Sequence, residues 1–299
     1  MAREKFNESD LYIIQAVTNL HVGSGDNNFG IIDNQVQRDV LTGRPTINSS
    51  SLKGSLREYF DPENKSSQFI RYVFGSPPTE KNEVEDKNQK EKEDKSSKQE
   101  KGKFTFVSAT LLSIPLRSNT KTFFRATSPE IIEEFISNLS SFDIKLEQEK
   151  LLQELANLKP NKEVFIFEDI KNETIIEDTK TQYIEKDLSS LEEILGKDIA
   201  IVENALLNDY CADLPIVARN HLENGESQNL WYEEIVPRES RFYFTVTKPK
   251  NLDNKDSKNI GTYETKFDDM GMVQIGANAT IGYGYTKINK VKKVVQDEN

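Results

Sequence analysis

Residues 30–60 read GIIDNQVQRDVLTGRPTINSSSLKGSLREYF, and this stretch carries most of the information on the fold. Three serines at 49–51 precede LKGSLREYF, in which apolar residues recur at helical spacing. Serine is favoured where a helix begins, because its hydroxyl can accept a hydrogen bond from a free backbone N–H. The stretch therefore predicts an amphipathic helix that is capped by the serines.

Strand-like and helical segments alternate on both sides of this helix. β-branched and aromatic residues predict strands, and apolar residues at helical intervals predict helices. The expected strands are 11–22, 104–116, 122–127, 164–169, 241–247 and 283–295, and the expected helices are 129–140, 145–157 and 187–198. This mixed order predicts an α+β fold.

Two other segments stand out from the alternation. Residues 76–103 contain one aliphatic residue, Val84, in a mixture of charged and polar residues, and a segment of this kind cannot offset the entropy cost of ordering. It is expected to be a disordered insertion or a poorly held charged helix. Residues 214–236 place Asn224-Gly225 between two extended arms, which predicts a protruding β-hairpin with a type I′ turn.

Composition limits the cellular setting. The 299 residues have no apolar run near the roughly 20 residues that span a bilayer, and the N-terminus lacks the pattern of a secretory signal. With Cys211 as the only cysteine, no internal disulfide can form. These features predict a cytoplasmic protein. A net charge of −11 argues against nucleic acid at first, but a local cluster of Lys and Arg can hold phosphates on one face.

Such a cluster is expected on the serine-led helix. Lys53 and Arg57 lie four residues apart and share a face beside the free N–H groups of the first turn, a setting that can bind phosphate. The alternative is an ordinary solvated helix face. The closing loop, QIGANATIGYGY at 274–285, has glycines that allow close approach of a sugar-phosphate backbone and tyrosines that could stack on bases. Here the alternative is a turn into the last strand.

Few residues are candidates for catalysis. Asp33 could position Mg²⁺ or polarise a hydroxyl, or it could be a turn aspartate. The only histidines, His21 and His221, form no Ser/His/Asp or paired-histidine pattern. Neither Gly23-Ser24-Gly25 nor Lys53-Gly54 fits a nucleotide-binding motif, so nucleotide hydrolysis is not supported.

Taken together, five stretches resemble the RAMP superfamily, and specifically the backbone subunit of Cmr-type (type III-B) CRISPR complexes. They are LHVGSG at 20–25, residues 30–60, FTFVSATLLSIPLRSNTKTFFRATSP at 104–129, LWYEEIVP at 230–237 and VQIGANATIGYGYT at 273–286. The type III-A (Csm) backbone subunit shares much of this pattern. Ser108 stands where the family pattern has an aspartate before Ala109.

The resemblance implies one elaborated domain over residues 1–299, an RRM/ferredoxin-like palm, with 214–236 as an inserted thumb hairpin and 76–103 as a charged insertion. It also implies subunits that stack head to tail along CRISPR guide RNA, together with large, small and capping RAMP subunits. Each thumb would displace one base pair, and Asp33 would cut the target RNA there with Mg²⁺ or Mn²⁺ bound at low affinity. Guide and target RNA would be held by Gln37, Arg38, Ser50, Ser51, Lys53, Gly54, Arg57, Arg219, Trp231, Gly276, Asn278, Thr280 and Gly282.

Trp231 and Arg219 would wedge beside bases, although the sole tryptophan could equally lie in the palm core. Two other functions use the same fold. One is a guide-binding backbone subunit that does not cleave. The other is a metal-independent RNase that processes guide RNA with His21 as general acid or base.

Overall fold

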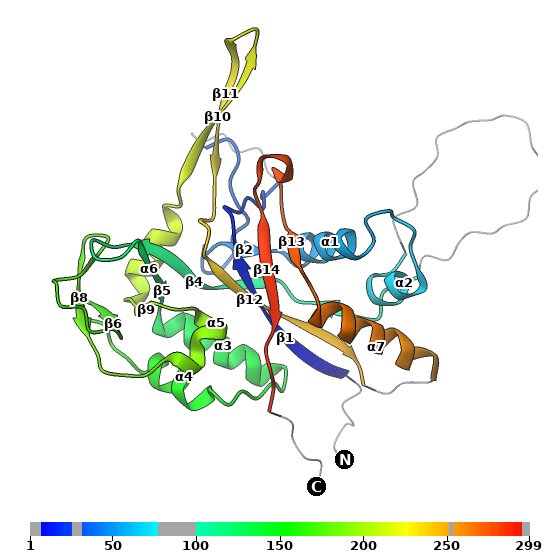
Figure 1. The fold of residues 1–299 in the computed structure, drawn as a ribbon, viewed down its shortest axis with the longest axis horizontal. Helices are drawn as coiled ribbons and strands as arrows, with labels where there is room; N and C mark the ends of the chain where they lie inside the picture. The colour runs from blue at the N-terminus through cyan, green and yellow to red at the C-terminus, as the bar shows by residue number, and fades with distance from the viewer. Residues whose placement is uncertain (1–6, 26–31, 77–99, 251–253, 295–299) are drawn as a thin grey trace, which may run out of the picture.

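The computed structural model describes residues 7–25, 32–76, 100–250 and 254–294 (Figure 1). Strands and helices are mixed along the chain, as the sequence predicts. In chain order they are β1 (Asn7–Ala16), β2 (Thr46–Ile47), α1 (Ser49–Phe60), α2 (Gln68–Phe74), β3 (Thr105–Phe106), β4 (Ala109–Arg117), β5 (Phe123–Thr127), α3 (Pro129–Ser141), α4 (Glu149–Ala156), β6 (Val164–Ile166), β7 (Ile175–Ile176), β8 (Thr179–Tyr183), η1 (Ser189–Leu191), α5 (Glu192–Leu195), β9 (Ile199–Ile201), α6 (Asn204–Ala212), β10 (Ile216–Glu223), β11 (Glu226–Glu234), β12 (Arg241–Pro249), α7 (Asn254–Asp268), β13 (Met272–Gln274), η2 (Ala279–Ile281) and β14 (Tyr285–Lys290).

Four antiparallel strands form the centre of the main sheet, in the spatial order β14-β1-β12-β4. Numbered along the chain, these are the fourth, first, third and second strands. Helices α1 and α2 follow the first strand, and α7 follows the third. This is the arrangement of a ferredoxin-like βαββαβ unit, so the predicted palm is confirmed.

A long insertion between β4 and β12 forms the inserted lobe. Its strands extend the sheet in the order β5-β9-β6-β8-β7, beside α3, α4 and α5 (Figure 1). Within the same insertion, β10 and β11 form a separate two-stranded sheet that projects away from the palm (Figure 1). The turn residues Asn224 and Gly225 have φ of 52° and 85°, as the predicted type I′ turn requires.

Aromatic side chains fill the core between the palm sheet and α7. The rings of Tyr12 and Phe244 stack 5.1 Å apart, and Tyr263 and Phe267 of α7 lie 4.3 Å apart against them. The hydroxyls of Tyr12 and Tyr263 are 2.6 Å apart, which satisfies both groups inside the core. The sequence analysis did not predict α7, because its few apolar residues are diluted by polar ones.

Several predicted boundaries differ from the structure. The strand expected at 11–22 ends at Ala16, and Leu20 instead bridges to Val236 beyond the hairpin. The helix expected at 187–198 consists of the short turns η1 and α5, because the chain turns at Gly196 with φ of 90°. Helix α6 was not predicted.

The start of α1 also differs in detail. The N-cap residue is Asn48, whose side chain makes no capping hydrogen bond, and the three serines form the first turn. The N–H of Ser49 donates to Oγ of Ser108, 3.0 Å away on the segment before β4. The prediction that the serines cap the helix is therefore wrong. Ser108, which stands where the family pattern has an aspartate, thus accepts a helix-start N–H.

Most of the charged insertion, residues 77–99, lies outside the described residues, so the prediction of disorder stays a prediction. Its two ends are held together, since the Ser76 N–H donates to the Glu100 carbonyl and the Glu100 N–H donates to Ser76 Oγ. None of the helices in the described ranges is both long and apolar enough to cross a membrane.

Candidate nucleic-acid interface

Three segments that are distant in sequence meet at the base of the hairpin. The Gln37 side chain joins the Asp33 segment to α1, because Nε2 donates to Ser51 Oγ at 3.0 Å and Oε1 accepts from the Asn48 N–H at 2.8 Å. The glycine loop joins the same region through the Ala277 N–H, which donates to the His21 carbonyl at 2.9 Å. Gly23 bridges to Val36 between them. The aspartate segment, the serine-led helix and the closing glycine loop thus form one contiguous surface.

Asp33 lies at the edge of the hairpin with an exposed side chain. Its Oδ2 accepts a hydrogen bond from the Tyr232 N–H at 2.8 Å, and its own N–H donates to the Tyr232 carbonyl at 3.1 Å. Within the described ranges, Oδ1 makes no hydrogen bond. One carboxylate oxygen is therefore used to fix the side chain, and the other is available to a ligand.

The donor set around Asp33 fits only a weakly held metal ion. The described residues contain no group of three or more His, Cys, Asp or Glu side chains that could hold a metal. One carboxylate oxygen can supply one ligand to Mg²⁺ or Mn²⁺, whose remaining ligands must then come from water and phosphate oxygens.

Lys53 and Arg57 are the cations of this surface that lack a carboxylate partner among the described residues. Arg57 makes one long hydrogen bond, from Nη2 to Ser66 Oγ at 3.4 Å. Burial lowers the pKa of the half-buried Lys53, and the positive charge of Arg57 lowers it further. Two neighbouring cations without counter-charge are poised to bind an anion.

The neighbouring backbone is open to a ligand. No atom lies within 4 Å of where a Cβ would stand on Gly54, which is exposed in the middle of α1. Ser50 is exposed and Ser51 is half-buried in the first turn, and among the described residues their N–H groups have no acceptor. The start of α1 therefore offers free donors next to Lys53.

Arg38 does not belong to this group of free cations. Its Nη1 donates to the carbonyls of Cys211 at 2.6 Å and Gly43 at 2.7 Å, and its Nη2 forms an ion pair with Glu234. The structure places Arg38 at the base of the hairpin with most of its donors occupied. Its predicted contact with RNA stays a prediction.

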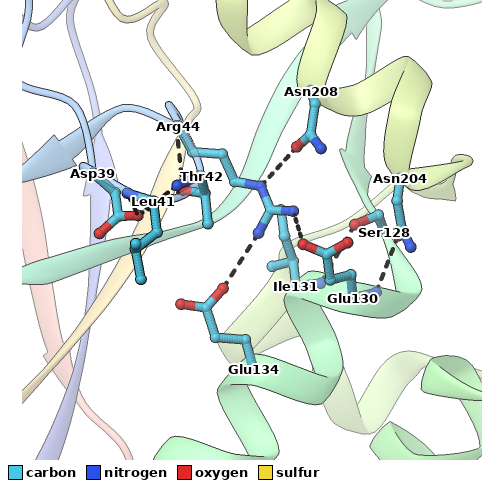
Figure 2. Close-up of polar contacts among 10 residues, drawn as sticks. All are labelled: Asp39, Leu41, Thr42, Arg44, Ser128, Glu130, Ile131, Glu134, Asn204 and Asn208. Atoms are coloured by element: carbon cyan, nitrogen blue, oxygen red, sulfur yellow. Dashed lines mark hydrogen bonds and ion pairs between the residues drawn. The ribbon is translucent and has the colours of Figure 1, made fainter.

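Arg44 of the same motif is buried and serves the fold. Figure 2 shows its guanidinium between α3 and α6, where Nη2 and Nη1 reach Glu130 at 2.5 Å and Glu134 at 3.2 Å. Its Nε donates to Asn208 Oδ1 at 2.9 Å. Arg44 therefore ties the motif to the inserted lobe, and it is not available to RNA.

Glycines shape the closing loop, but the close approach at Gly276 is made by the protein's own backbone, so the predicted approach of RNA stays a prediction. Gly276 has φ of 90°, and a Cβ there would lie 2.3 Å from the His21 carbonyl oxygen, so only glycine allows this close approach. Thr280 and Gly282 are exposed at the tip of the loop. Asn278, with φ of 66°, donates its side-chain N–H to Glu233, and its predicted contact with RNA stays a prediction.

Trp231 and Arg219 form a cross-strand pair on one face of the hairpin. Trp231 is half-buried on the hairpin and is not part of the palm core, so that alternative is excluded. The Arg219 guanidinium stacks 4.6 Å from the centre of the Tyr283 ring. Both side chains also donate to Glu233 and are therefore held at the hairpin base. Their predicted insertion beside bases stays a prediction.

Exposed apolar side chains lie on the opposite face of the hairpin. The cross-strand register and the alternation of strand side chains place Ile216, Leu222, Leu230 and Tyr232 together on this face. Leu222 and Leu230 are 58% and 54% exposed, so no other part of the described chain covers this face. The sequence pattern did not predict it, because periodicity alone does not show which face of a strand a neighbouring loop covers.

The sequence analysis also missed Glu233 and Glu234, which are both buried at the end of β11. Two consecutive carboxylates after an aromatic pair, in LWYEEIVP, are the only sequence signal for them. His21 is 5% exposed, and its Nδ1 lies 2.7 Å from the Glu234 carbonyl oxygen. A buried ring in this position does not favour the alternative in which His21 acts on RNA.

Comparison with known proteins agrees with this architecture. A family model described as the RAMP superfamily matches residues 13–287. The chain is 27% identical over 296 residues to the CRISPR system Cmr endoribonuclease Cmr4 of Pyrococcus furiosus, with 92% of this chain and 93% of that protein covered.

Two solved structures share the fold. The crystal structure of oligomeric Cmr4 from Pyrococcus furiosus superposes with a TM-score of 0.69 at 22% identity, covering 97% of this chain and 100% of that chain. A chain of the Type III-B Cmr-beta complex bound to cognate target RNA gives 0.69 at 21% identity, covering 94% and 96%. Because the family model matches nearly the whole sequence, this chain belongs to the RAMP superfamily.

Proposed function

We propose that the chain is a repeating backbone subunit of a type III CRISPR ribonucleoprotein, which binds guide RNA and cleaves complementary target RNA at regular intervals. The observation that carries the proposal is the joining of Asp33, the unpaired cations of α1 and the glycine loop into one surface at the base of a protruding hairpin. The similarity to the Cmr endoribonuclease and to a complex bound to target RNA supports it. The subtype favoured by these relatives is III-B.

Guide RNA lies across the start of α1 in this proposal. Lys53 and Arg57 bind phosphates by charge, and the free N–H groups of Ser50 and Ser51 donate to phosphate oxygens. Contacts of this kind position RNA without reading its sequence, so base pairing with the guide selects the target. Copies of the chain stack along the guide in a helical filament, with other effector subunits at its ends and sides.

Cleavage depends on distortion of the target beside the hairpin. A nucleotide removed from the A-form stack can bring its 2′-oxygen in line with the adjacent phosphorus, which the regular duplex prevents. The P–O2′ bond forms as the P–O5′ bond breaks, the proton leaves the 2′-hydroxyl and a proton is gained by the 5′-oxygen. The products are a 2′,3′-cyclic phosphate and a 5′-hydroxyl.

Asp33 lies beside the hairpin strand β11 and has one carboxylate oxygen that makes no hydrogen bond to the described residues. The hydrogen bond from the Tyr232 N–H holds the side chain in place, and Oδ1 orients the attacking hydroxyl. A divalent ion held by the same oxygen would supply positive charge to the phosphate. This dependence on Mg²⁺ or Mn²⁺ is part of the proposal.

The test replaces Asp33 by Asn and by Ala in the assembled complex. Asn keeps an oxygen that can accept the Tyr232 N–H but removes the negative charge. We expect both variants to retain guide and target and to lose cleavage by about 100-fold or more, and we expect EDTA to stop the unmodified complex. Cleavage by Asp33→Asn at the original rate, or target fragments ending in a 3′-hydroxyl, would contradict the proposed chemistry.

A non-cleaving backbone subunit is the rival outcome of the same experiment. If the unmodified complex binds guide and target but never cuts the target, the surface binds RNA only. Cleavage of precursor guide RNA by the isolated chain, unaffected by EDTA, would instead indicate guide processing.

A further inference from the structure

The hairpin meets the palm at two adjacent buried carboxylates. Glu233 is 6% exposed and Glu234 is 3% exposed, and they are consecutive residues at the end of β11. Side chains of neighbouring strand residues point to opposite faces, so the two carboxylates leave the hairpin in opposite directions. A buried carboxylate is costly unless it is paired and hydrogen-bonded, which indicates a specific role for both.

Glu233 connects the hairpin to the glycine loop. Its Oε2 accepts from Arg219 Nε at 3.1 Å and from Asn278 Nδ2 at 2.9 Å, and its Oε1 accepts from Trp231 Nε1 at 2.9 Å. Asn278 belongs to the loop, whereas the other two donors belong to the two hairpin strands. Burial alone would raise the pKa of Glu233, but the hydrogen bonds from Trp231 and Arg219 lower it below its usual value. The carboxylate therefore stays charged at neutral pH.

Glu234 connects the same point to the Asp33 segment. Its Oε2 accepts from the Val36 N–H at 3.0 Å, and its Oε1 forms the ion pair with Arg38. The backbone adds to this connection, since Asn34 bridges to Glu233 in parallel and the Glu234 N–H donates to the Asn34 carbonyl at 2.9 Å. The two loops that form the candidate interface are thus attached to opposite faces of the hairpin base.

Beyond this base the hairpin has little support. All residues from 220 to 230 are exposed, and an isolated two-stranded hairpin is marginally stable in water. Its direction must therefore be set where it leaves the palm. Because the Tyr232 N–H holds Asp33, a change in that direction also moves the carboxylate.

We propose that Glu233 is a positioning residue, which fixes the hairpin against the glycine loop and so sets the placement of the hairpin tip and of Asp33 relative to the cations of α1. Glu234 fixes the hairpin base to the Asp33 segment in the same way. The effect on RNA rests on the proposed function, but the effect on hairpin direction does not. Glutamine cannot replace Glu233, since in either orientation its amide N–H groups would face at least one of the three N–H donors.

Distance measurements on the full-length chain test the direction of the hairpin. Cys211 is buried, so spin labels can be placed selectively on introduced cysteines. Suitable sites are Gln228→Cys at the exposed hairpin end and Ser137→Cys on the exposed face of α3. Pulsed electron–electron double resonance should give a distance distribution with one main peak for the parent. We expect Glu233→Gln to broaden it or shift its centre.

Matched variants separate positioning from loss of charge or of folding. Glu226→Gln removes the same charge from the exposed hairpin end and should leave the distribution unchanged. Asn278→Gly removes the loop contact without straining the backbone at its φ of 66°, and it should broaden the distribution by a smaller amount. If Glu233→Gln and Asn278→Gly both give the parent distribution, the positioning role is wrong.

Target cleavage provides the second readout. In the assembled complex, Glu233→Gln should lower the cleavage rate about tenfold or more with guide binding retained, and Glu233→Asp, which keeps the charge, should restore part of the rate. A normal rate in Glu233→Gln would overturn the link to Asp33. If the parent complex cuts no RNA, the proposed function fails, whereas the distance distributions still decide whether Glu233 positions the hairpin.

Discussion

Arg44 and Lys53 belong to the same sequence motif, yet they lie in opposite electrostatic settings. Arg44 is 3% exposed and meets Glu130, Glu134 and Asn208 (Figure 2). Lys53 is half-buried beside Arg57, and neither has a carboxylate partner in the described part of the chain. The first cation is neutralised within the protein and stabilises the fold. The second pair keeps its charge for a ligand.

This difference explains how an acidic protein can bind a polyanion. The net charge of −11 describes the whole chain, whereas a phosphate near α1 responds mainly to charges within about 10 Å at physiological salt. Two cations without counter-charge beside free helix-start N–H groups make that neighbourhood positive. Position within the fold thus matters more than total charge.

The largest expected effect is the loss of stability when the buried Arg44 is replaced. Arg44→Ala should lower the free energy of unfolding by about 2–3 kcal/mol, because three acceptors lose their donor, although the two glutamates are partly exposed and can regain water. Urea unfolding followed by circular dichroism measures this. Arg117→Ala, which removes an exposed ion pair with Glu177, is the control and should leave the midpoint unchanged. An unchanged midpoint for Arg44→Ala would show that Arg44 does not stabilise the fold.

A smaller effect is expected when the unpaired cations Lys53 and Arg57 are replaced. The double variant Lys53→Ala/Arg57→Ala should keep the stability of the parent within about 0.5 kcal/mol and weaken guide binding by about 1–2 kcal/mol. The plot of log affinity against log salt should become shallower by about one unit per lost phosphate contact. Lys65→Ala, which removes a cation that is paired with Glu63, serves as the control. If the double variant binds guide with the parent's salt dependence, these cations do not bind phosphate.

The smallest expected effect is the uptake of a fraction of a proton by Lys53 when guide RNA binds. Its pKa is below the ordinary value of 10.5, so Lys53 loses its proton at a lower pH than an unperturbed lysine. A bound phosphate favours the ammonium form and raises the pKa again, so guide binding at an alkaline pH below 10.5 should take up a fraction of a proton. Calorimetry in two buffers of different ionisation enthalpy measures this uptake.

Lys53→Arg is the matched variant, because arginine stays charged throughout this range. It should bind guide RNA but lose the uptake. Equal proton uptake in the parent and in Lys53→Arg would assign the titration to another group.

Sequence patterns predicted the elements that depend on local chemistry. The β-branched runs, the apolar spacing of α1 and α3 and the Asn224-Gly225 turn were all visible, because strand, helix and turn preferences act over a few residues. Helix α7 was not visible, since its helical spacing depends on Ile260, Tyr263 and Phe267 among many polar residues. Only the tertiary contacts, such as the packing of Phe267 against Tyr12 and Phe60, show that this face of the helix is part of the core.

The candidate site was predicted in a similar, partial way. Asp33, Lys53 and the glycine loop were identified because carboxylates, paired cations and glycines have recognisable chemistry. The sequence could not show that these segments meet. In the structure they are joined through Gln37 and through the His21 carbonyl. Their individual contacts with RNA stay predictions.

The sequence by itself determined the α+β class, the hairpin and the residue types able to bind and cut RNA. Only the tertiary structure decided which charges are free. Arg38 and Arg44 are as basic as Lys53 and Arg57 in the sequence, but the first two lie against carboxylates from β11 and α3. The reason is physical: a charge is neutralised by whatever group the fold brings within a few ångströms, and that distance is unrelated to separation along the chain.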